Sequence, residues 1–225
     1  MAQALDAAQA RVAEAAARAG RRADEVALVA VSKTFPAEAV RAAAACGQRD
    51  FGENYVQEAR AKQEELAGLG LVWHFIGPIQ SNKTRDIAAH FDWVHGIERE
   101  KIARRLSEQR PPGLPPLNVC IQVNVSGEAS KSGAAPGEVA ALAGVVCTLP
   151  GLKLRGLMAI PEAGGDPRPR FRLLRELRDA LNAGGLALDT LSMGMSQDLE
   201  SAILEGATIV RVGTAIFGSR PKPRP

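Results

Sequence analysis

The sequence of 225 residues predicts a single-domain TIM barrel of the (β/α)8 type. Short apolar runs alternate along the chain with longer amphipathic stretches, and this alternation of strand and helix is typical of a parallel sheet. The apolar runs are continuous rather than interrupted by polar residues, which indicates strands buried on both faces. About eight such units close most economically into a barrel. A doubly wound open sheet is the alternative that the pattern leaves open.

The first predicted element is an extra helix over residues 3–19, ahead of the repeating pattern. It is rich in strong helix formers and stops at Gly20, as a helix with a glycine C-cap does. Strands are predicted after it at residues 26–32, 49–51, 71–76, 92–95, 117–125, 153–159, 186–192 and 207–212. Helices are predicted between them at residues 37–46, 54–67, 80–90, 98–109, 135–148, 167–183 and 197–205. Several of these helices open with Pro, Ser or Asn, which are common at helix N-termini.

These elements predict one barrel domain over residues 1–218, with the helical segment 1–20 packed on it. No internal stretch has the composition of a linker that would separate a second domain. Residues 219–225 read SRPKPRP, and their prolines cannot continue a helix or a sheet ladder. We therefore expect these residues to form a disordered tail.

Composition and charge indicate a cytoplasmic protein that binds neither nucleic acid nor membranes. The formal charge is +3, and the basic residues are scattered rather than gathered into blocks with aromatics. Cys46, Cys120 and Cys147 have no paired spacing, which fits a reducing compartment, and no cluster has metal-ligand spacing, so no metal is expected. Asp6 and Glu14 interrupt the N-terminal segment, which lacks a signal peptide's apolar core, and no later run could span a bilayer.

A lysine stands where the first predicted strand ends, in the stretch VALVAVSKTFP. The carboxyl ends of the strands carry the active site in a TIM barrel, so Lys33 is expected on the functional rim. A lysine at a strand end ordinarily points into solvent. At the mouth of a largely apolar barrel, however, desolvation favours the neutral amine, which attacks carbonyl groups and forms Schiff bases.

Two late loops predict a phosphate site on the same rim. Ser196 opens a predicted helix after the seventh strand, and Gly213 and Thr214 follow the eighth. These residues also fit ordinary turn chemistry, but in TIM barrels the loops after strands seven and eight commonly bind phosphate. Arg211 needs an acceptor on a ligand or an ion-pair partner such as Glu53. An imine-forming lysine, a phosphate site and an arginine between them describe a receptor for pyridoxal 5′-phosphate (PLP).

Seven ordered motifs connect this interpretation to a known family. They are AVSKTFP, FGENYVQE, WHFIGPIQSNK, QVNVSGEASKSG, GLMAIP, SMGMSQDLESAILEG and VRVGTAIFG. With these motifs the chain resembles, over residues 28–218, the pyridoxal phosphate homeostasis proteins, which are single-domain barrels similar to the N-terminal domain of alanine racemase. The resemblance implies an alanine racemase N-terminal-domain-like barrel that binds PLP.

The resemblance also implies which residues contact the cofactor: Lys33, Asn54, His74, Met193, Ser196, Arg211, Gly213 and Thr214. Lys33 would carry PLP as a covalent aldimine, and Arg211 would face the pyridine nitrogen. The residues of the two late loops would hold the phosphate, and Asn54 and His74 would line the pocket near the ring. Lys131 is a second amine that could approach the aldehyde, although we prefer to interpret it as a solvated loop lysine.

Three functions are compatible with this site. We expect a cytoplasmic, monomeric carrier that stores, buffers or delivers PLP, meets apo PLP-dependent enzymes transiently and has no catalytic residue. The second function is amino-acid racemisation or decarboxylation. Racemisation in the relative uses a tyrosine from a separate domain, whereas the one tyrosine here, Tyr55, lies at the start of a predicted helix. A charged arginine at the ring nitrogen also weakens the ring as an electron sink. The third function is a Schiff-base aldolase acting on a sugar phosphate.

Overall fold

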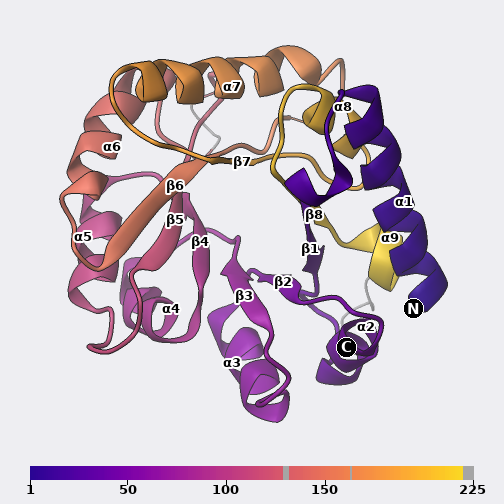
Figure 1. Ribbon diagram of the computed structural model, residues 1–225. Coiled ribbons are helices and arrows are strands. Elements are labelled where there is room, and N and C mark those ends of the chain that lie inside the picture. The colour runs from indigo at the N-terminus through magenta and orange to yellow at the C-terminus, as the bar shows by residue number, and fades with distance from the viewer. Residues whose placement is uncertain (129–131, 163, 220–225) are drawn as a thin grey trace.

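The computed structural model describes residues 1–128, 132–162 and 164–219, and in it eight parallel strands close into a barrel (Figure 1). Each strand pairs with the next in sequence, and β8 pairs with β1. The strands are β1 Ala27–Val31, β2 Asp50–Glu53, β3 Val72–Phe75, β4 Trp93–Ile97, β5 Leu117–Gln122, β6 Leu152–Met158, β7 Thr190–Ser192 and β8 Ile209–Val212. The closed barrel confirms the predicted fold class and excludes the open sheet.

Helices surround the barrel on its outside (Figure 1). The α-helices are α1 Ala2–Arg18, α2 Ala37–Ala45, α3 Val56–Glu65, α4 Thr84–His90, α5 Glu100–Glu108, α6 Val139–Cys147, α7 Arg168–Ala183, α8 Leu199–Leu204 and α9 Thr214–Phe217. Short 3₁₀ turns are η1 Ala23–Glu25, η2 Ser81–Lys83 and η3 Pro136–Glu138. No helix in the described part of the chain is long and apolar enough to cross a membrane.

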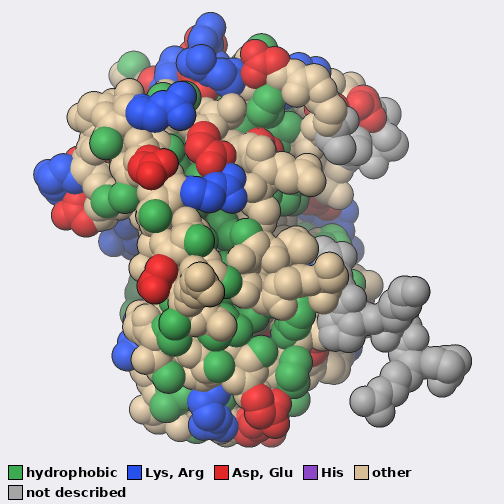
Figure 2. All heavy atoms as spheres, turned by 90° about the vertical axis from the view of Figure 1, so that its right-hand side faces the viewer, with side chains coloured by type: hydrophobic (Ala, Val, Ile, Leu, Met, Phe, Trp, Pro, Cys, Tyr) green, Lys and Arg blue, Asp and Glu red, His purple; other side chains and the backbone are tan. Residues whose placement is uncertain are grey.

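The extra helix α1 covers the last units of the barrel, beside α8 and α9 (Figure 1). Leu5, Ala8 and Val12 recur on one helix face and are buried. On a more polar side, Arg11 Nε lies 2.7 Å from Glu200 Oε1 of α8. Figure 2 shows the molecule from this side, with acidic and basic side chains interspersed. The helix α1 therefore packs against α8 and α9, which follow the predicted phosphate loops.

The seventh strand is shorter than predicted. The expected range was 186–192, whereas β7 begins at Thr190. The side chain of Asn182 explains the difference, because its Oδ1 accepts from Leu188 N–H (2.7 Å) and its Nδ2 donates to Leu188 O (2.9 Å). These bonds use the two backbone groups that a sheet ladder would need.

The chain after β8 forms a helical turn, α9, that the sequence did not predict. It is too short for hydrophobic periodicity to reveal. Phe217 in this turn stacks on Phe35 after β1, with ring centroids 5.2 Å apart, and so joins the last and first units of the barrel. The predicted tail follows, and its residues 220–225 lie outside the described residues, as does Lys131.

Gly156 marks a very close approach between two strands. A β-carbon on this residue of β6 would lie 1.8 Å from Thr190 O in β7. Gly156→Ala must therefore push the strands apart, and we expect it to lower the free energy of unfolding by about 3 kcal/mol. Gly144→Ala is the control, because nothing lies within 4 Å of the added carbon. It should stabilise α6 by roughly 0.5–1 kcal/mol. Urea denaturation measures both effects, and native stability of Gly156→Ala would contradict this strand packing.

Candidate functional site

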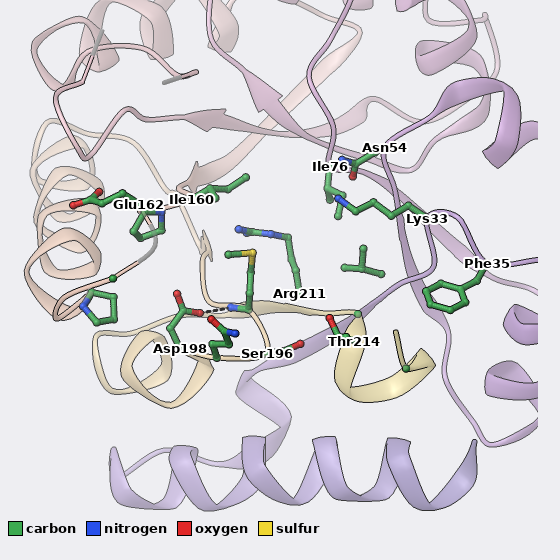
Figure 3. A pocket seen from close by; sticks show the side chains of 18 of the residues that line it. Lys33, Phe35, Asn54, Ile76, Ile160, Glu162, Ser196, Asp198, Arg211 and Thr214 are labelled. Atoms are coloured by element: carbon green, nitrogen blue, oxygen red, sulfur yellow. Dashed lines mark hydrogen bonds between the residues drawn. The ribbon is translucent and has the colours of Figure 1, made fainter. Parts of the chain in front are cut away.

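A cavity of about 650 Å³ opens at the carboxyl ends of the barrel strands. Its walls come from the segments at or after the ends of β1, β2, β3, β6, β7 and β8. The predicted contact residues that line it are Lys33, Asn54, Ser196, Arg211, Gly213 and Thr214. In Figure 3, Lys33 reaches in from one side, Arg211 lies near the middle, and Ser196 and Thr214 lie along the wall below it. The structure thus brings together six of the eight predicted residues.

His74 and Met193, the other two predicted residues, lie away from this cavity wall. His74 is 2% exposed inside the barrel, and its Nε2 lies 3.0 Å from Asp50 Oδ1, at the amino end of β2. Its side chain therefore points down the barrel, away from the carboxyl-end rim. Met193 is fully buried in the hydrophobic core. Both contacts were implied by the family resemblance, and a sequence motif gives no measure of the height of a side chain along the barrel axis.

The turn that carries Lys33 is fixed by residues of α3. Thr34 has a positive φ of 70°, which is rare for a β-branched residue. Its N–H donates to Glu58 Oε1 (2.6 Å). The buried Lys62 Nζ donates to the same carboxylate oxygen (2.5 Å) and to Ser32 O (2.8 Å). Such a conformation costs on the order of 1–3 kcal/mol, so these bonds are what hold the turn in place.

Glu53 is not the partner of Arg211 that the sequence allowed. It is fully buried, and its Oε1 accepts from Ser32 Oγ (2.6 Å) and from Lys62 Nζ (2.7 Å). Burial raises the pKa of Glu53, and the Lys62 ammonium opposes that rise. The glutamate therefore belongs to the group that fixes the Lys33 turn, and Arg211 has other partners.

Arg211 is a buried cation held by neutral acceptors. It is 3% exposed; Nη1 donates to Ser192 Oγ (2.6 Å) and Nη2 donates to Ala159 O (2.9 Å). Burial lowers its pKa to about 10, so the guanidinium is still charged at neutral pH. Among the described carboxylates none forms an ion pair with it. A guanidinium has five N–H donors, so this one favours an acceptor atom on a ligand in the cavity.

Asn54 contributes a polar atom without a partner. Its Oδ1 is buried and has no hydrogen-bond partner among the described residues, although Asn54 lines the cavity. The segment after β3 approaches so closely that a β-carbon on Gly77 would lie 2.7 Å from Asn54 O. An unsatisfied buried oxygen costs about 1–3 kcal/mol, which a ligand donor could recover.

The opposite wall offers hydroxyls and backbone N–H groups. Ser196 and Thr214 supply the hydroxyls, and the first turn of α9 supplies N–H groups that lack an intrahelical acceptor. Contacts within the fold hold the loop after β7: Arg11 Nη2 donates to Ser196 O (2.9 Å), and Met195 N–H donates to Asp198 Oδ1 (2.6 Å; Figure 3). Together with Lys33 and Arg211, this donor set fits a ligand that has a carbonyl group, a ring acceptor and a phosphate.

The wall also contains residues that were not predicted from the sequence, among them Phe35, Ile76, Ile160, Glu162 and Met195. All of them follow strand ends, so their position in the chain was the available signal. Glu162 is held by Ser126 and Arg170, and the hydrogen bond from Ser126 is the main reason that the pKa of Glu162 is lowered. Within the described ranges, no group of three His, Cys, Asp or Glu side chains could hold a metal ion.

Comparison with known proteins places this geometry in context. Residues 4–221 match the family model described as the N-terminal domain of alanine racemase. The chain is 66% identical over 211 residues to the pyridoxal phosphate homeostasis protein of Pseudomonas aeruginosa, covering 94% of this chain and 92% of that protein. It is 55% identical over 222 residues to the protein of the same name from Vibrio cholerae, covering 96% and 94%.

A solved structure agrees with these sequence matches. The structure of PipY from Synechococcus elongatus PCC7942 with PLP bound superposes with a TM-score of 0.81 at 39% identity. The superposition covers 92% of this chain and all of that one (100%). The matches therefore extend over the whole barrel and include the walls of the cavity.

Proposed function

Because this chain belongs to the family of pyridoxal phosphate homeostasis proteins, we propose that it binds PLP in the cavity at the carboxyl ends of its strands and maintains the intracellular supply of this cofactor. PLP supplies, when bound, an aldehyde that an amine can trap and an electron-withdrawing ring. One observation carries the proposal: Lys33, Arg211 and the hydroxyls of two late loops reach a single cavity from different strands. The PipY structure that contains PLP supports it.

Each residue has a distinct part in this proposal. Lys33 tethers the cofactor covalently, and its turn is held from α3 by Glu58. Arg211 donates to the ring nitrogen from a position fixed by two neutral acceptors. Ser196 and Thr214, with the backbone at Gly213, bind the phosphate.

We further propose that the protein does not turn over a substrate. A guanidinium that remains charged at neutral pH disfavours a proton on the ring nitrogen, and an unprotonated ring is the poorer electron sink. Tyr55, the one tyrosine of the chain, is 55% exposed at the start of α3 and does not line the cavity. The wall offers no tyrosine as a second base for racemisation, and carrier function needs none.

This absence of turnover is directly testable. Purified protein loaded with PLP should racemise or decarboxylate common amino acids no faster than a heat-denatured sample containing the same PLP. Chiral chromatography and carbon dioxide release measure the two reactions. Sustained turnover that Lys33→Ala abolishes would contradict the carrier assignment and favour a PLP-dependent enzyme. Turnover of a sugar phosphate without PLP would favour an aldolase.

Transfer of the cofactor tests the homeostasis role itself. Protein carrying PLP is mixed with an apo PLP-dependent enzyme, and recovery of that enzyme's activity is compared with recovery in the same amount of free PLP. Equal rates support passive buffering, and faster recovery from the loaded protein supports direct delivery. Bound PLP that never reaches the apo-enzyme would contradict the proposal.

We also propose that the chain acts as a cytoplasmic monomer that meets apo-enzymes transiently. The contacts proposed for PLP all come from residues of this chain. Light scattering of the purified protein measures the mass in solution. A stable dimer would contradict the monomer proposal without affecting the assignment of the cofactor site.

A further inference from the structure

A continuous row of polar side chains crosses the interior of the barrel. Asp50 Oδ1 lies 3.0 Å from His74 Nε2, and His74 Nδ1 lies 3.0 Å from His95 Nε2. His95 Nδ1 lies 2.7 Å from Ser192 Oγ, which accepts from Arg211 Nη1 at 2.6 Å. The residues come from β2, β3, β4, β7 and β8. His74 and the three residues after it in the row are at most 3% exposed, so water does not replace these bonds.

The direction of every bond follows from the two ends. Arg211 can only donate, so Ser192 Oγ accepts from it, and His95 Nδ1 is the acceptor in the row for the hydroxyl proton of Ser192. His95 must then carry its proton on Nε2 and donate to His74 Nδ1. His74 in turn donates from Nε2 to a carboxylate oxygen of Asp50. This arrangement keeps both histidines neutral and gives every donor in the row an acceptor.

The electrostatics of the interior agree with this arrangement. Burial, followed by the nearby His74 and Arg211, holds the pKa of His95 well below its ordinary value. A neutral His95 can accept at one ring nitrogen and donate at the other. The ring of Trp93 stacks on His74 at a centroid distance of 5.6 Å and fixes its plane.

The two ends of the row open on different cavities. Arg211 lines the cavity at the carboxyl ends of the strands, where PLP is proposed to bind. Asp50 has a side chain that is 35% exposed and lines a second cavity of about 430 Å³. This second cavity lies beside α1, at the amino ends of β1 and β2. The row therefore runs through the barrel from one face to the other.

We propose that Asp50, His74, His95 and Ser192 form a directional hydrogen-bond relay that positions the Arg211 guanidinium toward the proposed cofactor site. These four are positioning residues, because none of them lines the carboxyl-end cavity. The relay commits the Ser192 proton to His95, so a lone pair of Ser192 always faces Arg211. Nη1 then stays on Ser192, Nη2 stays on Ala159 O, and the remaining donors are presented to the cavity. The role toward the cofactor rests on the proposed function, whereas the relay itself does not.

The first test uses the protein without added PLP. Long-range ¹H–¹⁵N correlation of histidine-labelled protein at neutral pH should show His74 and His95 as neutral rings protonated at Nε2. His90, exposed at the end of α4, provides the reference of a histidine in water. A proton on Nδ1 of either buried ring, or a cationic ring, would overturn the relay.

Variants show whether the relay acts from end to end. Ser192→Ala removes the partner of His95 on the Arg211 side, and Asp50→Leu removes the acceptor at the other end of the row. In both variants, His95 should no longer be held in a single tautomer. Asp50→Asn keeps an acceptor oxygen and should preserve it. Thr190→Ala is the matched control, because its hydroxyl lies on the same strand but donates to Asp189 Oδ1. If Ser192→Ala does not fold, the tautomer of His95 in Asp50→Leu, a variant at the amino ends of the strands, tests the relay. An unchanged tautomer in the folded end variants would overturn the relay.

The second test adds PLP to the native chain and to the same variants and records the absorption spectrum of the bound cofactor. We expect the absorption maximum to shift in Asp50→Leu and in Ser192→Ala but not in Asp50→Asn or Thr190→Ala. An unshifted maximum in both end variants would overturn the effect on Arg211. If no PLP binds to the native chain, the proposed function fails while the histidine signals still report on the relay, so the two failures are distinguishable.

Discussion

We expect Lys33→Ala protein to be colourless after PLP is added and unbound PLP is removed, whereas the native chain should stay yellow. Among the lysines of the described residues, Lys33 lines the cavity and lies opposite the donor set for the phosphate, so its removal takes away the amine that is proposed to hold the aldehyde. The absorption band of the bound cofactor should disappear completely. Titration of each protein with PLP, followed by absorbance and by equilibrium dialysis, measures colour and residual affinity separately.

Two further variants separate the tether from a charge effect. Lys33→Arg keeps the positive charge but cannot condense with an aldehyde. After unbound PLP is removed, this variant should therefore also lack the absorption band of the bound cofactor. Lys101→Ala removes an exposed lysine of α5 and should behave like the native chain. If Lys33→Ala keeps the absorption band of bound PLP and binds PLP with native affinity, the proposed role of Lys33 is contradicted.

Loss of either hydroxyl at the late loops should weaken PLP binding by about 10- to 100-fold. Ser196→Ala and Thr214→Val each remove a donor to a charged phosphate, and a hydrogen bond of this kind contributes about 1.5–3 kcal/mol. Pyridoxal has the same aldehyde and ring but no phosphate, so its weaker binding should hardly change in these variants. Dialysis or fluorescence titration with both ligands gives the two dissociation constants.

A control on α6 tests whether the effect is local. Thr148→Val removes the exposed hydroxyl that donates to Val145 O, far along the chain from either late loop, and should leave both affinities unchanged. Equal losses for PLP and pyridoxal in Ser196→Ala and Thr214→Val would show that the variants disturb the cavity in general. The phosphate would then have to be placed elsewhere.

The barrel was predictable because its determinants are local. Continuous apolar runs mark strands buried on both faces, and repetition of the strand–helix unit leaves closure as the most economical outcome. The prediction was wrong where a bond from one side chain to the backbone decides the structure. Leu186 and Leu188 belong to an apolar run, but Asn182 bonds the backbone of Leu188 and delays the start of β7.

The candidate site was predictable to the extent that chain position determines it. Residues at strand ends converge in a barrel, so Lys33 and Thr214 could be placed on one rim from sequence. The height of a side chain inside the barrel could not be predicted from chain position. In the structure, His74 points toward Asp50. Contacts between distant segments, such as Arg11 with Ser196 O, were likewise invisible to pattern and spacing.

The most direct test of the account is the position of the covalent link. Protein saturated with PLP is reduced with borohydride and digested, and the peptides are weighed by mass spectrometry. We expect the added mass of the reduced cofactor on the peptide that contains Lys33, in a stoichiometry of about one per chain. An adduct on the neighbouring Lys62 or on Lys131 with Lys33 unmodified, or no adduct at all, would contradict the account.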